Sequence, residues 1–444
     1  MNKRRMATAI AAGMTVAALT GALAGCSSAE GGNDADGKVY YLNFKPEQAE
    51  DWVALAEAYT EETGVAVDVQ TAASGTYETT LKSEMAKSDA PTLFQVNGPV
   101  GLANWKDYVA DLSDTAIYEH LNDQSVALTG EDDAVLAVPY VMETYGIIYN
   151  KKIVGDYIAL GDAAVASIDE ITDFDTFSAV VEGIQEHKDE LGIEGAFTSS
   201  GFDSSSDWRF KTHLANLPLY WQFAADGVDG QPAEINDSFL DGYQRIFDLY
   251  INNATVEPST LSGKTIEDAN SEFALGKAAF YQNGTWAYGD VSGQAVADED
   301  LGMLPIYIGA DGEENSGLAT GSENYWVINN EASEADQKAT KDFLEWVITS
   351  ETGRDSLANT MGFVTPFDTF ADYLPSNPFV QADAAYTEAG KTAVTWNFTV
   401  MPSEEWKNGV GQALLQYAQG TGDWAAVETA FVDGWAAEYQ LANG

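Results

Sequence analysis

The chain has 444 residues, of which 45% are hydrophobic and 11% are aromatic, so a largely disordered protein is excluded because enough apolar surface is present to offset the entropy of ordering. Single hydrophobic cores stop growing at about 250 to 300 residues, and we therefore expect two lobes. The formal net charge of −49, from 21 basic and 70 acidic residues, disfavours nucleic acid and anionic lipid surfaces as partners, since both would be repelled.

The start of the chain has the composition of a processed leader and a tether. Basic residues within 1–5 precede the uncharged, alanine- and glycine-rich run 6–25, which is typical of a secretory signal and too weakly apolar for a membrane-spanning helix. This run leads through Leu-Ala-Gly into Cys26, the only cysteine in the sequence, and resembles the lipobox of bacterial lipoproteins. We therefore predict a signal peptide over 1–25, lipidation of Cys26 and a flexible tether over 26–37. The protein is expected on the extracellular face of the cell membrane, held there by this lipid anchor.

Alternating strands and helices are predicted after the tether. A strand at 39–44, a helix, a strand at 65–69, a helix at 76–88 and a strand at 92–96 follow one another. The first helix has apolar residues at helical spacing, namely Trp52, Leu55, Ala56 and Tyr59. This strand and helix order predicts a parallel sheet covered by helices.

Three further amphipathic helices are predicted later in the chain, because apolar residues recur at helical spacing over 174–184, 239–251 and 339–347. Two of them have the spacing of a capping box before the helix, in Thr172 with Asp175 and in Ser333 with Asp336. No period of 20 to 50 residues recurs, which disfavours a solenoid or a propeller. The sequence thus indicates an α/β protein with two lobes.

Motifs of enzyme chemistry are missing from the sequence. The three histidines, His120, His187 and His213, have no spacing of metal ligands. There is no Gly-x-Ser-x-Gly elbow, phosphate-binding loop or dinucleotide fingerprint. We therefore predict no catalytic residue, no metal and no cofactor. A secreted glycoside hydrolase or lyase stays open as an alternative, because two carboxylates suffice for glycoside hydrolysis and 70 acidic residues are present.

Four blocks of sequence carry a family pattern. They are Asn-Phe-Lys at 43–45 with Glu-Glu-Thr-Gly-Val-Ala-Val at 61–67; Val-Pro-Tyr at 138–140 with Tyr-Gly-Ile-Ile-Tyr-Asn-Lys-Lys at 145–152; Gly-Lys-Ala-Ala-Phe at 276–280 with Asn-Gly-Thr-Trp at 283–286; and Gly-Ser-Glu-Asn-Tyr-Trp-Val-Ile at 321–328 with Met-Gly-Phe-Val-Thr-Pro at 361–366. Together these blocks resemble the extracellular solute-binding proteins of carbohydrate ABC importers, the family that includes the maltose-binding protein.

The resemblance spans essentially the whole chain after the tether and implies a fold. That fold is α/β, with two Rossmann-like lobes joined by hinge crossovers, as in type II periplasmic binding proteins. The expected N-terminal lobe contains 38–145 and 318–366, and the expected C-terminal lobe contains 146–317 and 367–444. A ligand cleft is expected between the lobes. The resemblance also implies a monomer that binds an oligosaccharide, catalyses nothing, and delivers the sugar to the membrane permease of an ABC transporter.

Aromatic side chains are the first class of predicted ligand contacts, because a sugar presents apolar C–H faces that stack on flat rings. By resemblance, Trp286 is the best platform, Tyr220 and Trp221 fall in a second aromatic segment, and Trp406 falls in a third. Trp396 is a further candidate. Each ring alone also fits the packing of a hydrophobic core.

Polar side chains are the second class, because sugar hydroxyls both donate and accept hydrogen bonds. We expect Lys45 and Asn97 to contact ligand from loops that follow strands, Glu143 from the first crossover, and Asn324 from the return strand. Each of these residues also fits a solvated surface. The segment 202–213 departs from the family pattern and is where specificity is expected. The identity of the sugar does not follow from these residues, and a binder of another solute on the same fold stays open.

Overall fold

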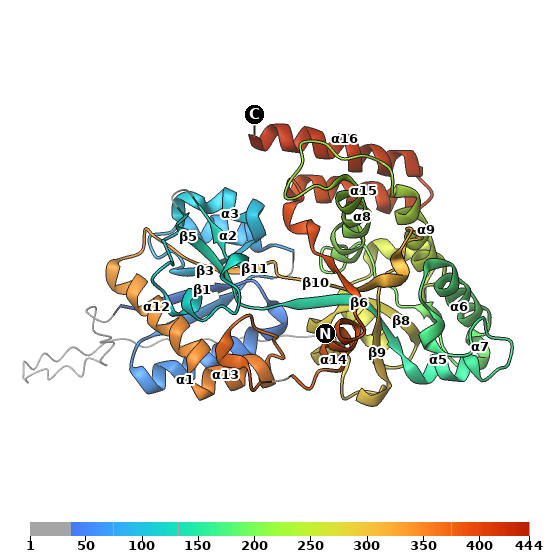
Figure 1. Cartoon of the computed structure of the whole chain (residues 1–444), viewed down its shortest axis with the longest axis horizontal. Coiled ribbons are helices and arrows are strands. Elements are labelled where there is room, and N and C mark those ends of the chain that lie inside the picture. The colour runs from blue at the N-terminus through green and yellow to red at the C-terminus, as the bar shows by residue number, and fades with distance from the viewer. Residues whose placement is uncertain (1–36, 74, 131–132, 374, 444) are drawn as a thin grey trace, which may run out of the picture.

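The computed structural model describes residues 37–73, 75–130, 133–373 and 375–443. The predicted signal peptide, Cys26 and all but the last residue of the predicted tether lie outside these residues. Figure 1 shows two lobes side by side, with long strands running between them. Among the described residues, no helix combines the length and the apolar character needed to cross a membrane.

The first lobe contains a six-stranded sheet of order β2-β1-β3-β11-β5-β4. β1 pairs in parallel with β2 and β3, as predicted, whereas β11 runs antiparallel to β3 and β5. The strands are β1 (Val39–Asn43), β2 (Val67–Thr71), β3 (Leu93–Asn97), β4 (Leu128–Thr129), β5 (Val135–Pro139) and β11 (Asn324–Ile328). The helices are α1 (Ala49–Thr63), α2 (Tyr77–Met85), α3 (Gly98–Trp105), α4 (Ala116–Glu119), α12 (Glu334–Thr349) and α13 (Glu351–Asp355).

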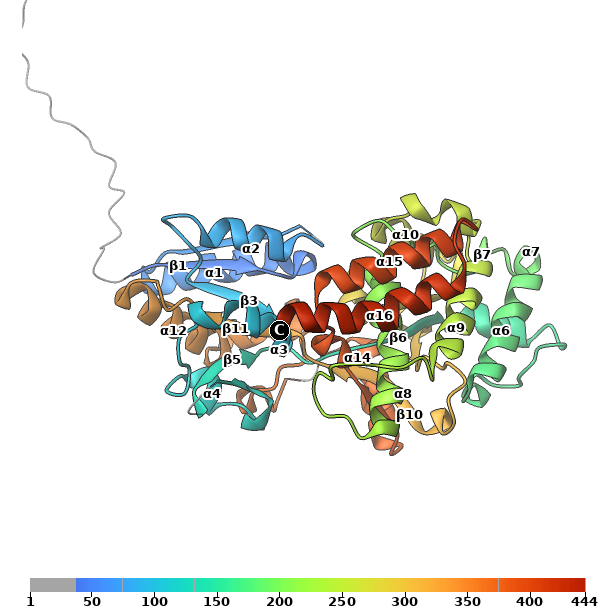
Figure 2. The ribbon, with the colours of Figure 1, turned by 90° about the horizontal axis from the view of Figure 1, so that it is seen from above.

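The second lobe contains a sheet of order β12-β10-β6-β8-β7, with β9 also paired to β6. Its strands are β6 (Glu143–Asn150), β7 (Gly195–Phe197), β8 (Ala278–Gly284), β9 (Leu301–Leu304), β10 (Ser316–Gly321) and β12 (Thr392–Thr395). Its helices are α5 (Lys151–Ile158), α6 (Phe174–Glu186), α7 (Lys188–Leu191), α8 (Asn216–Asp226), α9 (Leu240–Asn252), α10 (Ile266–Ala274), α11 (Tyr288–Val291), α14 (Pro378–Glu388), α15 (Glu404–Ala418) and α16 (Trp424–Asn443). Figure 2 shows α15 and α16 lying together along one face of this lobe.

The chain passes between the lobes at two strand junctions. β5 ends at Pro139 in the first sheet, and β6 begins at Glu143 in the second sheet. β10 ends at Gly321 in the second sheet, and β11 begins at Asn324 in the first. The expected boundary at 318 therefore lies inside β10, which pairs with β6 and so belongs to the second lobe.

A third crossing follows α13. Phe367 and Phe370 are buried in the core of the first lobe, together with Trp326, whereas Phe379 at the start of α14 is buried in the second lobe. The segment after 366, expected in the C-terminal lobe, thus stays with the first lobe as far as Tyr373. The reason is its aromatic side chains, which pack onto the first sheet: the Phe367 ring lies 6.4 Å from the Trp326 ring, nearly parallel to it.

The predicted apolar stripes account for the packing of the helices. Trp52, Leu55, Ala56 and Tyr59 on α1 are all buried, and the Trp52 ring contacts Trp326 edge to face at 6.1 Å. The predicted Ser333 cap of α12 is confirmed, because its hydroxyl accepts a hydrogen bond from the Asp336 N–H. The predicted Thr172 cap of α6 is wrong. Asp173 caps this helix instead and accepts from the Thr176 N–H, since an aspartate offers the stronger, charged acceptor at that position.

Candidate functional site

Three buried polar side chains meet where the chain crosses between the lobes. Lys45 follows β1, Glu143 begins β6 and Asn324 begins β11. The Lys45 ammonium lies 2.8 and 3.0 Å from the two carboxylate oxygens of Glu143, and the Asn324 amide donates to Glu143 at 3.2 Å. Burial opposes the charge on Lys45, yet the adjacent Glu143 carboxylate holds the lysine pKa above its usual value. The three side chains therefore form one ionic network at the hinge.

Trp286 faces this network from the second lobe, in a short 3₁₀ helix directly after β8. The Lys45 ammonium lies 5.9 Å from the centre of the Trp286 ring and 5.8 Å from that of Phe363. The Arg209 guanidinium lies 5.6 Å from the Trp286 ring. Trp286 is partly buried, so part of its surface is open to a ligand.

More aromatic rings surround Trp286. His213 lies 5.4 Å from Trp286 and stacks on Tyr145 at 4.6 Å. Trp396 lies 6.4 Å from Trp286 and 4.8 Å from Phe398. Burial and then the Arg209 charge lower the pKa of His213 well below its usual value, so this imidazole is neutral at pH 7. Apolar rings and a neutral histidine thus form the second-lobe side of the site.

Glu323 lies in the connection from β10 to β11, beside the ionic network. Burial, and next the charge of Glu143, raise the pKa of Glu323 to about 7. The charges of Lys407 and Lys45 act in the opposite direction. At neutral pH this carboxyl is therefore protonated in a large fraction of molecules and can donate as well as accept a hydrogen bond.

The lobes touch each other next to Asn97. Asn97 pairs with Asn324 across β3 and β11, and the side-chain oxygen of each amide is buried without a partner among the described residues. Gly98, the next residue, has φ +64°, and a Cβ placed there would lie only 2.7 Å from the Thr399 Cβ of the second lobe. The first lobe thus approaches the second through backbone at this point, which only glycine permits.

Comparison with known proteins identifies the class. The sequence of residues 54–388 matches the family described as bacterial extracellular solute-binding protein. The chain belongs to this family. No curated protein sequence matches it, but solved structures match over nearly its full length.

Three of these solved structures illustrate the match. A chitin oligosaccharide binding protein has a TM-score of 0.71 and 17% identity, over 91% of this chain and 98% of its own. RafE in complex with raffinose has a TM-score of 0.68 and 17% identity, over 92% and 100%. The GacH receptor of Streptomyces glaucescens has a TM-score of 0.68 and 18% identity, over 91% and 99%. The predicted fold of two α/β lobes, of the type II periplasmic-binding-protein kind, is confirmed by these matches.

The remaining predicted site residues of this solute-binding protein lie elsewhere. Trp406, on α15, is buried with a relative exposure of 2%, contacts Phe431 and Trp435 of α16 edge to face, and donates its indole N–H to the Phe431 carbonyl. Tyr220 and Trp221 lie on α8, partly buried against the second-lobe core and in contact with each other. The structure brings Lys45, Asn97, Glu143, Asn324, Trp286 and Trp396 together at the junction of the lobes, but not these three rings.

Two side chains of the site, Arg209 and His213, come from the segment 202–213, in which no individual residue was predicted. They lie one turn apart in the π-helical segment Arg209–Leu214. The only signal in the sequence was that this segment departs from the family pattern. The position of Glu323 between the Gly-Ser and Asn-Tyr-Trp residues of the fourth block did not indicate that its side chain would be partly buried.

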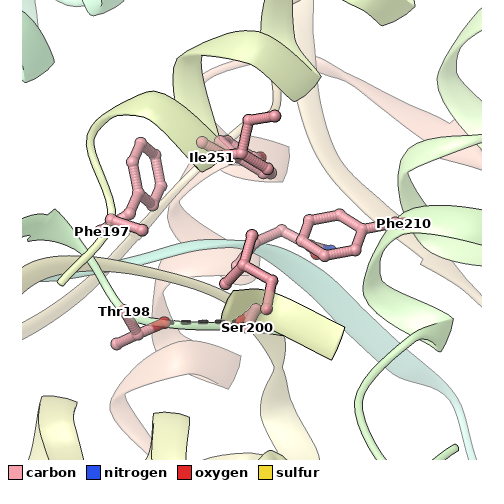
Figure 3. A pocket seen from close by; sticks show the side chains of 9 residues that line it. Phe197, Thr198, Ser200, Phe210 and Ile251 are labelled. Carbon is pink, nitrogen blue, oxygen red and sulfur yellow. Dashed lines mark hydrogen bonds between the residues drawn. The ribbon is translucent and has the colours of Figure 1, made fainter. Parts of the chain in front are cut away.

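A small cavity lies in the second lobe next to this segment, and Phe210 is one of the residues that line it (Figure 3). It offers about 10 Å³ for the centre of a water molecule, which is room for about one water. Its lining includes Thr198, whose hydroxyl lies 3.5 Å from that of Ser200, and the side chains of Tyr250 and Gln282, whose polar atoms have no partner among the described residues. The cavity suits a buried water molecule and is too small for a solute.

Within the described chain, no cluster of three His, Cys, Asp or Glu side chains could hold a metal ion.

Proposed function

We propose that this solute-binding protein binds an oligosaccharide between its lobes and delivers it, chemically unchanged, to the permease of an ABC importer. The observation that carries the proposal is the pairing of Trp286 and Trp396 with the buried network of Lys45, Glu143 and Asn324 at the lobe junction. Flat rings suit the C–H faces of a sugar, and the buried amides and charges suit its hydroxyls.

The solved structures of similar fold support a sugar over other solutes. They include a binding protein for chitin oligosaccharide, a protein in complex with raffinose and a receptor in complex with acarbose. At 17% to 18% identity the fold alone carries over, so the solute class rests on the side chains of the site. Lobe closure around the sugar would exclude water and alter the outer surface, and this change would report occupancy to the permease.

Replacement of the proposed platform tests this function. Trp286→Ala should weaken oligosaccharide binding by about 1 kcal/mol or more, measured by titration calorimetry on the sugar that stabilises the wild-type protein. The matched control is Trp346→Ala, because Trp346 is also partly exposed but lies on α12, against Tyr59 of the first lobe. Equal affinity of the Trp286→Ala variant and the wild-type protein for the sugar would show that the Trp286 ring does not contact the ligand.

We further propose that the mature protein is a monomer anchored to the extracellular face of the membrane through a lipid on Cys26. The lipid anchor rests on the sequence of 1–26 alone, and the monomer rests on the resemblance to the family. Cys26→Ser should move the protein from the membrane fraction to the soluble fraction of the producing cells. Retention of the Cys26→Ser variant in the membrane fraction would contradict the lipid anchor and leave the binding site unaffected.

A further inference from the structure

Buried basic side chains are confined to the lobe junction and its surroundings. Within the described chain the buried lysines and arginines are Lys45, Arg209, Lys211 and Lys407. Lys45 pairs with Glu143 at 2.8 Å, Lys211 with Asp207 at 2.6 Å and Lys407 with Glu404 at 2.7 Å. Arg209 is the exception. No carboxylate of the described residues lies within 4.0 Å of its guanidinium, although the chain has 70 acidic residues.

The contacts of Arg209 satisfy part of its hydrogen-bonding capacity, and none of them is with a carboxylate. One terminal nitrogen, Nη1, lies 2.9 Å from Nδ1 of His213, which accepts as a neutral imidazole. The guanidinium lies 5.6 Å from the Trp286 ring. Its Nε is buried without a partner among the described residues, and Arg209 as a whole has a relative exposure of 6%. An arginine stays charged under such conditions, and a buried charge without a counter-charge is unfavourable.

Neighbouring carboxylates act on this charge without touching it, because Glu47 and Glu323 favour the charged guanidinium but neither forms an ion pair with it. Glu143 is the partner of Lys45. Glu323, whose carboxyl carries its proton in a large fraction of molecules at neutral pH, forms no ion pair with Arg209. Glu47 is exposed to solvent on the first lobe. Arg209 is therefore a buried cation with no carboxylate of the described residues in contact.

We propose that Arg209 binds a carboxylate of the ligand, so that the transported oligosaccharide is acidic and contains a uronic acid. The guanidinium fork matches a carboxylate in a two-point contact. A sugar ring stacked on Trp286 would lie beside Arg209, which puts a ring carboxylate within its reach. One unpaired cation matches one negative charge, and the acidic groups nearby disfavour a dianion such as a phosphate monoester. This inference rests on the function proposed above and specifies its substrate class.

The test compares each acidic oligosaccharide with its own carboxyl-reduced form, in which the carboxylate has become an alcohol. The probes are galacturonate, mannuronate and glucuronate oligosaccharides and glucuronoxylan oligosaccharides, each titrated calorimetrically with and without reduction. At least one acidic probe should bind about tenfold or more tightly than its reduced form, as expected of a charge-assisted pair. Arg209→Gln should remove this preference, and Arg209→Lys should retain part of it.

Arg245→Gln is the matched control, because Arg245 is half-exposed on α9 and pairs with Asp175 at the surface. It should leave the preference for the acidic probe unchanged.

The thermal midpoint of the free Arg209→Gln protein should equal or exceed that of the wild type, since the variant no longer buries a charge that lacks an ion-pair partner. A large fall in the midpoint would contradict the inference. Reduced probes that bind as tightly as the acidic ones would overturn the acidic ligand and leave the sugar receptor intact. An absence of binding to every probe, neutral or acidic, would instead overturn the proposed function itself.

Discussion

Lys45 and Glu143 are joined by an ion pair of 2.8 Å that ties the end of β1 to the first crossing between the lobes. Both side chains are about 4% exposed, so removal of one leaves the other charged and buried. Lys45→Met should lower the free energy of unfolding by about 3 to 5 kcal/mol, measured by urea denaturation.

Two further variants qualify this prediction. The double variant Lys45→Met with Glu143→Met should recover much of the loss, because no uncompensated charge stays buried. The control is Lys338→Met, since Lys338 pairs with Asp342 on the exposed face of α12 and such surface pairs contribute about 0 to 1 kcal/mol. Similar losses in Lys45→Met and Lys338→Met would show that the buried pair has no special role.

Gly98 of the first lobe lies close to Thr399 of the second lobe. Gly98→Ala should weaken ligand binding several-fold, because the added Cβ would meet Thr399. Gly64→Ala is a suitable control, since Gly64 also has a left-handed backbone, with φ +80°, but no atom lies near its added Cβ. Both variants should lose stability from the positive φ. Titration calorimetry and solution scattering should show impaired binding and closure only for Gly98→Ala, and equal effects of the two would disprove the steric argument.

The raised pKa of the Glu323 carboxyl predicts that ligand binding depends on pH. Its pKa in the structure is about 7, raised from 4.5 by burial and by Glu143, so the folded state with these contacts retains the proton more strongly than a state in which the carboxyl is exposed to water. This favours the state in which the carboxyl is buried fully below about pH 4.5, and the advantage is lost as the pH rises through about 7. A ligand bound between the lobes, as proposed above, would keep the carboxyl buried. Other charged groups that act on Glu323 are Lys407, Lys45 and Glu404. Affinity should therefore fall between about pH 5 and 8.

The variant Glu323→Gln separates this carboxyl from the other titrating groups. Its amide is neutral at every pH, so the affinity should stay nearly constant over the same interval. A wild-type pH profile that persists in Glu323→Gln would assign the titration to another group.

Trp406 should behave as a core residue. Its ring is buried between α15 and α16, and its N–H is satisfied by Phe431. Trp406→Ala should cost about 3 to 5 kcal/mol of stability. Below its melting temperature it should bind ligand within about twofold of the wild type, since a residue remote from the ligand couples weakly to binding. Loss of affinity without loss of stability would instead show that Trp406 contacts the ligand.

Local sequence patterns predicted the elements of the fold because they depend on neighbours in the chain. The stripe of Trp52, Leu55, Ala56 and Tyr59 is buried along α1 as expected. The same reasoning applied to α15 would have found Trp406, Val410 and Leu414 at helical spacing, all of them buried, and would have favoured core packing for Trp406 over a ligand contact.

The site was harder to predict because its residues come from distant parts of the chain. Lys45 and Glu143 are 98 residues apart, and only the crossing of the chain between the sheets brings them together. Arg209 and His213 belong to a π-helical segment, a backbone form without a sequence signature. The burial that shifts the pKa of Glu323 is likewise a property of the assembled lobes. Arg209, His213 and Glu323 thus owe their roles in the site to contacts between distant parts of the chain, which local sequence patterns do not predict.

The most direct test of the account is titration calorimetry of the protein, from Ser27 onward, with a panel of neutral and acidic oligosaccharides, while reducing ends are measured in the same samples. We predict saturable binding of at least one sugar without the release of new reducing ends. The appearance of new reducing ends would identify a glycosidase, and an absence of binding heat for every sugar in the panel would contradict a sugar receptor.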